Sequence, residues 1–522
     1  MGGSAALRVV LVKPSKYGVD GCVERFRRGF MPNSTLPHLK SLTLATEAGA
    51  GCEVRAIDEY VETDLAYLKL LAKSPGTRTL VAFVGVQSHQ FHRALDLAAF
   101  ALRNGAEGCV VGGPHPMTCD TSMLQGRGVS FSLSEAEVVW PKILGDARAG
   151  GLLPVYGREQ RWERELSPPV LIPPSRRDLS RYVVPILGVY PARGCPFSCN
   201  FCSVIRIAGQ RVRSQPVETT LASLRAAKAA GVKVVMFTSD NFNKVPEVEA
   251  LLAAMIEEKL ELPFFAQCDA QVHREEGLVE LLARAGCFQM FVGAESFSPE
   301  ALRGAHKLHN DPGTYARIVE LCRRHGITSH FSNILGFPGD TEEGILSHLR
   351  QLRELAPDVA SFYLLTPIPG TEQYEDFLEE GLVTERNLDR FDGSAVTWRH
   401  PNLPDDRLRS LVVRAYREFY GARDVASKAA GVLRRTRDFR RGQALYAVLG
   451  YSALSRLAVL SATHPMAGGV GRVRLDRAED YAALRRSVFG LDRAPLPHGL
   501  PLSKADEEGH RRPRTAAGTR VN

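Results

Sequence analysis

The feature that most constrains the fold is a sixfold alternation of apolar runs and helix-like patterns in residues 184–366. Each apolar run suits one buried strand, and each intervening pattern has the period of an amphipathic helix. Six consecutive βα units predict a partial, TIM-like (β/α)6 barrel, in which catalytic groups come from the C-terminal ends of the strands. The predicted strands are Val184–Tyr190, Val232–Thr238, Pro263–Gln267, Phe288–Val292, Thr328–Gly336 and Val359–Thr366. The predicted helices are Thr219–Ala230, Val245–Lys259, Glu276–Ala285, Tyr315–His325 and Glu342–Leu355.

Three cysteines, Cys195, Cys199 and Cys202, follow the first predicted strand within eight residues. This spacing does not suit one face of a helix or strand, and Gly194 and Pro196 suit a tightly wrapped loop, so the segment indicates a metal site. Structural zinc sites usually pair two such hooks, and no second hook lies nearby. Iron–sulfur clusters normally use four thiolates, so three leave one position open. A chance cluster of cysteines or an incomplete zinc hook is the alternative.

The spacing Cys-x3-Cys-x-aromatic-Cys, with Phe201 as the aromatic residue, resembles the cluster motif of the radical S-adenosylmethionine (radical SAM) superfamily. The resemblance implies that Cys195, Cys199 and Cys202 hold three irons of a [4Fe-4S] cluster. It also implies that the methionine part of S-adenosylmethionine chelates the fourth iron. The cluster loop follows the first barrel strand in that superfamily, as it does here.

Composition is ordinary for an enzyme of several domains. The 522 residues are 44% hydrophobic and 24% charged, which is enough for real cores. A net charge of +8 spread over this length is weak evidence for a nucleic-acid partner, so we do not expect one. The ten cysteines do not form a disulfide pattern, and the N-terminus lacks the features of a signal peptide. We therefore expect a cytoplasmic protein.

The N-terminal part, residues 1–150, also alternates between apolar runs and helix-like patterns. This alternation predicts a doubly wound, Rossmann-like α/β sheet, which binds ligands at the carboxyl ends of its strands. The predicted strands are Leu7–Val12, Cys52–Ile57, Leu80–Gln87 and Cys109–Val111, and the predicted helices are Leu36–Ala48 and Ala94–Asn104.

By its order and position, this part resembles the cobalamin-binding domain that precedes many radical SAM domains. The loop Gly112-Gly113-Pro114-His115 matches one corrin-lining segment of that family, and Glu135 lies in a second, whose glycines are replaced here. Glycines let a backbone approach a large ligand closely, and Ser88 offers a donor at a neighbouring strand end. The resemblance therefore implies bound cobalamin, with Ser88, Gly112, Gly113, Pro114 and Glu135 near the corrin. A flavodoxin-like module without a corrin is the alternative.

The histidines of this part, His89, His92 and His115, are not expected to bind cobalt. The Asp-x-His-x-x-Gly pattern that supplies a cobalt ligand in other cobalamin proteins is missing after the first strand. We expect local hydrogen bonds to satisfy these three side chains.

Polar residues follow the later barrel strands. The segment Gly-x-Glu-Ser that contains Glu295 resembles the superfamily element whose glutamate contacts S-adenosylmethionine. Asp240 and Asn241 follow the second strand and are assigned to the same ligand. Ser332 and Asn333 lie in the later part of the fifth predicted strand and are weaker candidates for it. In contrast, Cys268 and Cys287 are solitary and are predicted to be small buried hydrophobic residues.

The remaining segments connect or follow these two parts. Residues 151–180 are rich in proline and predict an ordered linker with little strand or helix, and residues 181–385 form the barrel. Residues 386–494 predict a mainly helical region that includes Asp405–Tyr420, and residues 495–522 predict a disordered basic tail. A run of arginines precedes Ala444–Ala462, which we interpret as a packed helix. Peripheral membrane contact by that segment is the less favoured alternative.

The function that the resemblance implies is a cobalamin-dependent radical SAM methyltransferase. One electron from the reduced cluster cleaves S-adenosylmethionine to a 5′-deoxyadenosyl radical, and methylcobalamin supplies a methyl group to an unactivated carbon of a small-molecule metabolite. An external one-electron donor such as flavodoxin or ferredoxin is expected as partner. The alternatives are a radical SAM enzyme that catalyses cyclisation, rearrangement or another non-methylating reaction, and a non-catalytic cluster- or corrin-binding sensor. No catalytic side chain is assigned.

Overall fold

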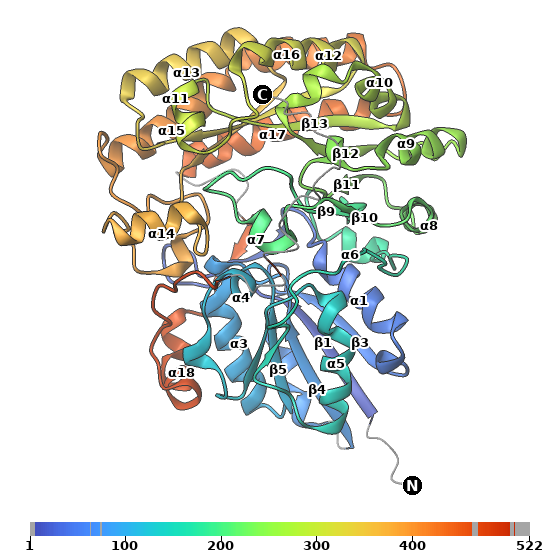
Figure 1. Ribbon diagram of the computed structural model, residues 1–522, viewed down its shortest axis with the longest axis vertical. Helices are drawn as coiled ribbons and strands as arrows, with labels where there is room; N and C mark the ends of the chain where they lie inside the picture. Colours follow the sequence, from blue (N-terminus) through green and yellow to red (C-terminus); the bar gives the residue numbers. More distant parts are fainter. Residues whose placement is uncertain (1–5, 63, 74–75, 462–467, 502–505, 507–522) are drawn as a thin grey trace, which may run out of the picture.

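The computed structural model describes residues 6–62, 64–73, 76–461, 468–501 and 506, and it contains two six-stranded parallel sheets placed end to end (Figure 1). The first sheet has the strand order β3-β1-β4-β5-β6-β7, which reverses direction beside β1 and confirms the doubly wound prediction. Its elements are β1 (Ala6–Lys13), α1 (Thr35–Ala45), β3 (Glu53–Asp58), α2 (Ala66–Lys69), β4 (Thr77–Phe83), α3 (Phe91–Arg103), β5 (Gly108–Gly112), α4 (Pro114–Thr118), β6 (Val129–Ser132), α5 (Ala136–Ala149) and β7 (Val155–Tyr156).

The second sheet has the strand order β15-β14-β13-β12-β11-β8, so each strand pairs with the next strand of the same sheet along the chain. This order confirms the partial barrel. Its elements are α6 (Arg176–Leu179), β8 (Leu187–Val189), β9 (Ala192–Arg193), α7 (Val204–Ala208), β10 (Arg213–Ser214), α8 (Val217–Ala229), β11 (Val235–Phe237), α9 (Val248–Glu257), β12 (Phe264–Cys268), α10 (Glu276–Ala285), β13 (Cys287–Glu295), α11 (Pro299–Gly304), α12 (Tyr315–Arg324), β14 (Thr328–Leu335), α13 (Glu342–Leu355), β15 (Val359–Leu364) and α14 (Glu372–Glu379).

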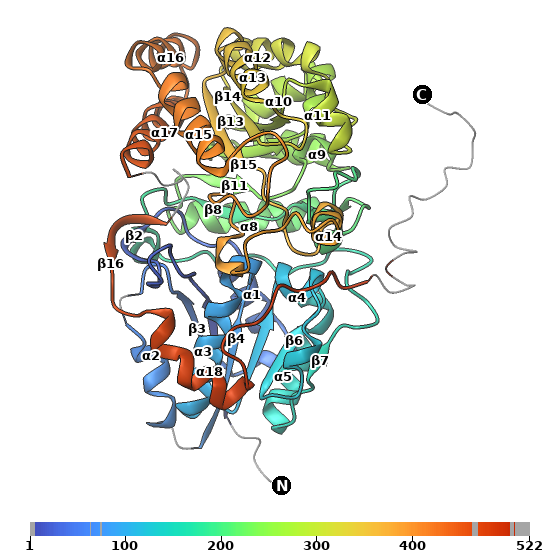
Figure 2. The ribbon, with the colours of Figure 1, turned by 90° about the vertical axis from the view of Figure 1, so that its left-hand side faces the viewer.

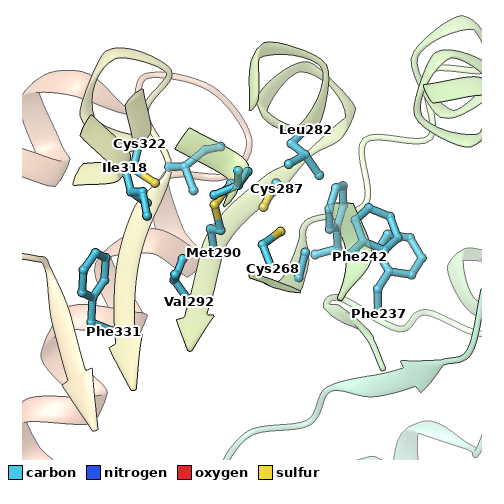
Figure 3. Close-up of a cluster of buried hydrophobic side chains, with 14 of the residues drawn as sticks. Phe237, Phe242, Cys268, Leu282, Cys287, Met290, Val292, Ile318, Cys322 and Phe331 are labelled. Carbon is cyan, nitrogen blue, oxygen red and sulfur yellow. The ribbon is translucent and has the colours of Figure 1, made fainter. Parts of the chain in front are cut away.

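The main core of the barrel lies between its sheet and the surrounding helices. Figure 3 shows the side chains of Cys268, Cys287 and Cys322 in this layer, which also contains Phe242 and Leu282. All three cysteines are buried, and burial raises the pKa of each thiol. Cys268 and Cys287 therefore behave as small hydrophobic residues, as predicted.

The region after the barrel packs against both sheets. It contains α15 (Asp405–Phe419), α16 (Ala422–Arg435), α17 (Arg441–Ser461), β16 (Gly469–Val473) and α18 (Ala482–Phe489). Helix α17 packs against β13, β14 and β15 of the barrel, whereas α18 packs on α3 of the first sheet, where Arg485 forms a buried ion pair with Asp96 at 2.6 Å. Figure 2 shows β16 beside β2 (Arg25–Gly29), with which it forms an antiparallel pair. The end of the chain thus returns to the first sheet.

The proline-rich linker contains little strand or helix, as expected, and its residues Val155 and Tyr156 add the edge strand β7 beside β6. The expectation of a disordered tail is wrong in part. The beginning of the expected disordered tail is ordered, since the Leu500 amide donates to the Thr118 carbonyl at 2.8 Å and Gly499 bridges to Cys119. Residues far away in the chain satisfy the backbone hydrogen bonds of these segments, and local composition does not reveal such pairing. Most of the tail lies outside the described residues.

No helix within the described residues has the length and apolar character needed to cross a membrane. The segment predicted as a packed helix, Ala444–Ala462, forms most of α17, and its residues Ala444 and Val448 are buried against Phe288 and Val359 of the barrel. Its final residue lies outside the described part of the chain.

Candidate functional site

The three cysteines lie on a loop between β9 and α7, at the C-terminal end of the first barrel strand. Gly194 has φ +106, and a Cβ atom there would lie 2.2 Å from the carbonyl oxygen of Arg211, so only glycine fits. The Cys195 amide donates to the Gly209 carbonyl at 3.1 Å, and the Cys202 amide donates to the Cys199 carbonyl at 3.1 Å. The backbone is therefore wrapped tightly and presents its thiols together.

Burial disfavours thiolates in this loop. It raises the pKa of Cys195 to about 11 and that of Cys202 to about 12, and the neighbouring sulfurs add to the effect. Nearby cations or bound metal are thus needed to hold three thiolates. No three Cys, His, Asp or Glu side chains in the described residues converge on a single ion.

Lys307 supplies a cation beside this loop, and the sequence analysis missed it. Its ammonium lies 3.6 Å from the Glu295 carboxylate and 5.9 Å from the centre of the Phe201 ring. Burial opposes its charge, but Glu295 and the three cysteine sulfurs outweigh burial and raise the pKa of Lys307. The residue follows the short helix α11 and belongs to no repeated spacing, so no sequence signal distinguishes it from a surface lysine.

A further contact from the same segment supports the cluster loop. The ring of His309 stacks on that of Phe197, with 3.5 Å between ring centroids and 10° between planes. The Asn200 amide also donates to the carbonyl of Ala305 at 3.2 Å. The segment after α11 therefore supports the cluster loop.

Glu295 ends β13 at an irregular point of the sheet. Its φ is +66, and the register with β14 shifts between Gly293 and Glu295. A left-handed conformation is uncommon for a residue other than glycine and often marks a functional position. Its carboxylate accepts a hydrogen bond from the Ser332 hydroxyl at 2.9 Å. Burial raises the pKa of the carboxyl, and Lys307 and Ser332 offset part of that rise.

Asp240 and Asn241 lie against the cluster loop. The side-chain amide of Asn241 donates to the Cys195 sulfur at 3.0 Å. Burial raises the pKa of Asp240 to about 6, and a hydrogen bond from the Gly194 backbone offsets part of the rise. The two residues support the cysteine end of the site, while Glu295 and Ser332 lie farther along the sheet.

Asn333, a weaker candidate, is occupied by the protein core. Its amide donates to the carbonyls of Phe331 and Ser361, and its oxygen lies 2.9 Å from Nε2 of His348. All of these groups are buried. Asn333 therefore fixes α13 to the sheet, and we do not assign it to a ligand.

A cavity of about 270 Å³ separates the strand ends of the first sheet from the barrel. It is lined by apolar side chains such as Trp140 and by predicted residues from both parts of the chain. Those predicted residues are Gly112, Gly113, Pro114, Glu135 and Asp240. The cavity lies at the carboxyl ends of the strands of the first sheet, where a doubly wound sheet binds its ligand.

The predicted polar residues of the first sheet have partners in the protein. The Ser88 hydroxyl lies 3.0 Å from Nδ1 of His115, which also packs on Phe91. Gly113 has φ +132, and a Cβ atom there would lie 2.2 Å from the Val86 nitrogen. The backbone of the neighbouring strand end thus requires this glycine.

The carboxylate of Glu135, which lines the cavity, forms an ion pair with an arginine of the barrel part. Both its oxygens lie 2.8 Å from the guanidinium of Arg213, which belongs to the antiparallel β9–β10 pair. Glu137 is paired in the same way with Arg193 and also contacts His38 at 2.8 Å. These ion pairs fasten the first sheet to the cluster loop, and a corrin contact by Glu135 stays a prediction.

Two of the histidines expected to be satisfied locally have partners. His92 contacts the Asp389 carboxylate at 3.1 Å and the Ala494 carbonyl at 3.1 Å, and His115 contacts Ser88. Burial lowers the pKa of His89 to about 4 and that of His115 to about 3. His38 is the histidine that lines the cavity, together with Tyr190 of the barrel.

Residues 189–352 match the family model described as the radical SAM superfamily. The matched segment begins in β8, includes the three cysteines and Glu295, and ends in α13. The chain contains a radical SAM domain. It is also 27% identical over 332 residues, 62% of this chain and 71% of the relative, to the bacteriochlorophyllide d C-12(1)-methyltransferase of Chlorobaculum tepidum. That alignment is longer than the radical SAM domain itself.

Two solved structures share the fold of the radical SAM domain and of the sheet before it. The methyltransferase TsrM from Kitasatospora setae, solved with cobalamin and a [4Fe-4S] cluster, has a TM-score of 0.60 at 17% identity and covers 85% of this chain and 99% of its own. The cobalamin-dependent radical enzyme OxsB, solved with aqua-cobalamin and S-adenosylmethionine, has a TM-score of 0.60 at 15% identity. The match covers 87% of this chain and 72% of the OxsB chain. These likenesses show the fold.

Proposed function

We propose that this chain is a cobalamin-dependent radical SAM enzyme that transfers a methyl group to an unactivated carbon of a small metabolite. The observation that carries the proposal is the placement of the Cys195, Cys199 and Cys202 loop. It lies at one end of the barrel, with Glu295 and Lys307 on one side and the cavity of the first sheet on the other. The names of the relatives and the shared fold support the same function.

The residues of the chain divide among three tasks in this proposal. Cys195, Cys199 and Cys202 bind the cluster, and Asn241 and Lys307 stabilise the negative charge on their sulfurs. Glu295, with Ser332, binds the amino group or the ribose of S-adenosylmethionine. The loop from Gly112 to Pro114 forms the wall against which cobalamin lies.

The bound groups supply the chemistry that side chains lack: an electron from the cluster, a radical from S-adenosylmethionine and a methyl group from the corrin. The chain positions these groups and excludes water by closing the two sheets on each other through Glu135–Arg213 and Glu137–Arg193. The electron must come from an external donor such as flavodoxin or ferredoxin.

Anaerobic reconstitution tests the proposal. The protein is loaded with iron, sulfide and cobalamin, reduced with dithionite and given S-adenosylmethionine, and 5′-deoxyadenosine and retained corrin are measured. We expect both in the unaltered protein and no 5′-deoxyadenosine in Cys195→Ala, Cys199→Ala or Cys202→Ala. If any of these variants still forms it at the full rate, the assignment of the cluster is wrong.

A radical reaction without methyl transfer is the second candidate. Of the two solved neighbours with a TM-score of 0.60, only TsrM is named a methyltransferase. Protein that forms 5′-deoxyadenosine but retains no corrin after growth with cobalamin would favour this candidate, whereas a methylated product would exclude it.

A further inference from the structure

A second, larger cavity of about 510 Å³ lies inside the barrel, and we call it the α17 chamber. One wall is the inner face of the sheet, including Phe265, Phe291 and His330. The opposite wall is α17, and Phe30 after β2 closes a third side. Figure 2 shows α17 between α16 and the β2–β16 pair, beside the barrel strands. Helix α17 and Phe30 lie outside residues 189–352, so the chamber is built only partly by the radical SAM match.

The chamber ends one layer of side chains away from Glu295, which lies at the proposed reaction centre. Phe291 and His330 line it, and the next inward positions on the same strands are Gly293 and Ser332. Two residues along a strand span about 6.6 Å. A Cβ atom on Gly293 would lie 2.7 Å from the Glu295 carboxylate, so this position borders Glu295 directly. Gly293 adds no side chain at this position, whereas Tyr363 both lines the chamber and interacts electrostatically with Glu295.

Among the residues that the structure describes, the walls of the chamber carry no acidic or basic side chain other than His330. Burial lowers the pKa of His330 to about 3, so its imidazole is neutral. The imidazole is also held on both sides, by Gln289 at 2.8 Å and by Ser361 at 2.6 Å. Ser361 continues the chain of hydrogen bonds to Tyr451 of α17, at 2.6 Å. The chamber is therefore fixed in shape and uncharged.

One polar atom of the walls remains unsatisfied. Within the described residues, the buried side-chain oxygen Oε1 of Gln443 has no hydrogen-bond partner. Gln443 lies on α17 and lines the chamber. A buried acceptor without a donor costs free energy, so rotation of this side chain toward an N–H or O–H group of a ligand in the chamber would be favourable.

We propose that the α17 chamber binds the apolar part of an uncharged substrate, with a hydroxyl or N–H group of that substrate donating to Gln443. The assignment rests on the proposed function, since it places a substrate carbon beside Glu295 and the cluster. The volume is in the range of small-molecule sites, which are mostly apolar with a few fixed polar groups. A charged substrate would lose its hydration here without gaining a partner.

Equilibrium dialysis of the cofactor-loaded protein with N-phenyl-1-naphthylamine tests the chamber. This probe is uncharged, has an apolar ring system and carries one N–H donor. Its sulfonated analogue, 8-anilino-1-naphthalenesulfonate, is the matched charged probe. We expect one molecule of the uncharged probe per chain and about tenfold or more weaker binding of the sulfonate.

Two substitutions on the same helix form a matched pair. Ala447 lines the chamber and Ala453 is exposed to solvent. Ala447→Trp should weaken binding of the uncharged probe by about tenfold or more, and Ala453→Trp should leave it within about twofold. Gln443→Leu should weaken it by about three- to tenfold through loss of the acceptor. If Ala447→Trp does not fold, as judged by circular dichroism, Leu454→Trp fills the same space.

Dithionite-driven cleavage of S-adenosylmethionine tests whether a ligand in the chamber affects the reaction. Saturating N-phenyl-1-naphthylamine should change the rate of 5′-deoxyadenosine formation in the unaltered and Ala453→Trp proteins, and not in Ala447→Trp. Equal probe binding by Ala447→Trp and Ala453→Trp, or an unchanged cleavage rate in the unaltered protein, would overturn the assignment. If neither the unaltered protein nor any variant forms 5′-deoxyadenosine, the proposed function is wrong. Dialysis still decides in that case whether the chamber binds an uncharged ligand.

Discussion

The side-chain amide of Asn241 donates a hydrogen bond to the sulfur of Cys195 over 3.0 Å. Both groups lie at the ends of neighbouring barrel strands, so the contact follows from the parallel register of β8 and β11. A donor to a cluster sulfur stabilises the reduced, more negative state and raises the reduction potential. The contact therefore connects barrel geometry to the redox chemistry of the proposed cluster.

Removal of this donor should make the cluster harder to reduce. Asn241→Leu keeps a similar volume and deletes the N–H group. One hydrogen bond is worth about 0.5–1.5 kcal/mol, so we expect the potential to fall by about 20–60 mV. A redox titration followed by electron paramagnetic resonance measures the shift. An unchanged potential would mean that Asn241 only packs against the loop.

Substitutions of Lys307 and Glu295 should have coupled effects on the free energy of unfolding. Lys307→Met leaves a buried carboxylate without its cation, which costs about 3–5 kcal/mol. Lys307→Met combined with Glu295→Gln removes the unpaired charge and should recover a large part of that loss. Urea unfolding of the cofactor-free single and double variants gives the coupling free energy. Additive losses in the double variant would show that the two side chains do not depend on each other.

The barrel and its cysteine loop were predictable because their signals are local. Each apolar run from Val184 to Thr366 contains one strand, and the boundaries of α10 and α13 agree with the predicted ranges. Glu295 was recognised because its neighbours form a short pattern. These features depend on residues close together in the chain.

Lys307, the β2–β16 pair and the α17 chamber were not predictable for the opposite reason. Arg25–Gly29 is too charged to resemble a strand, and its partner Gly469–Val473 lies more than 400 residues later. The chamber joins Phe30 to α17 across a similar separation. Contacts of this kind depend on how the two sheets are joined, and no spacing in the sequence encodes it.

The stability of the first sheet should depend on pH through Lys13. Burial lowers the pKa of this lysine from 10.5 to about 8, and its ammonium contacts Gln90 at 2.7 Å. Between the folded and unfolded pKa values the unfolded chain binds more protons, so this contribution to stability rises as pH increases from about 8 to 10.5. Relative to Lys13→Met, the unaltered protein should gain about 2 kcal/mol between pH 7.5 and 9.5.

The pH comparison is made by urea unfolding of both proteins without cofactors. Other groups titrate in the same interval, and subtraction of the Lys13→Met curve removes their contribution. A constant difference between the two curves would mean that Lys13 stays protonated in the folded protein.

Gly113→Ala and Gly126→Ala should separate the effect of the close backbone approach at Gly113, beside the cavity proposed for cobalamin, from the general cost of alanine at a positive φ. Both glycines have positive φ, +132 and +76, but an added Cβ atom lies 2.2 Å from the Val86 nitrogen at Gly113 and meets nothing within 4 Å at Gly126. Gly126→Ala should cost about 1–2 kcal/mol of stability and retain corrin. Gly113→Ala must displace the strand ends that line the cavity, so it should cost more than about 4 kcal/mol and lose corrin. Urea unfolding and the corrin content after anaerobic purification measure the two effects. Equal values for the two variants would show that the loop after β5 tolerates a side chain and does not need its close contact with β4.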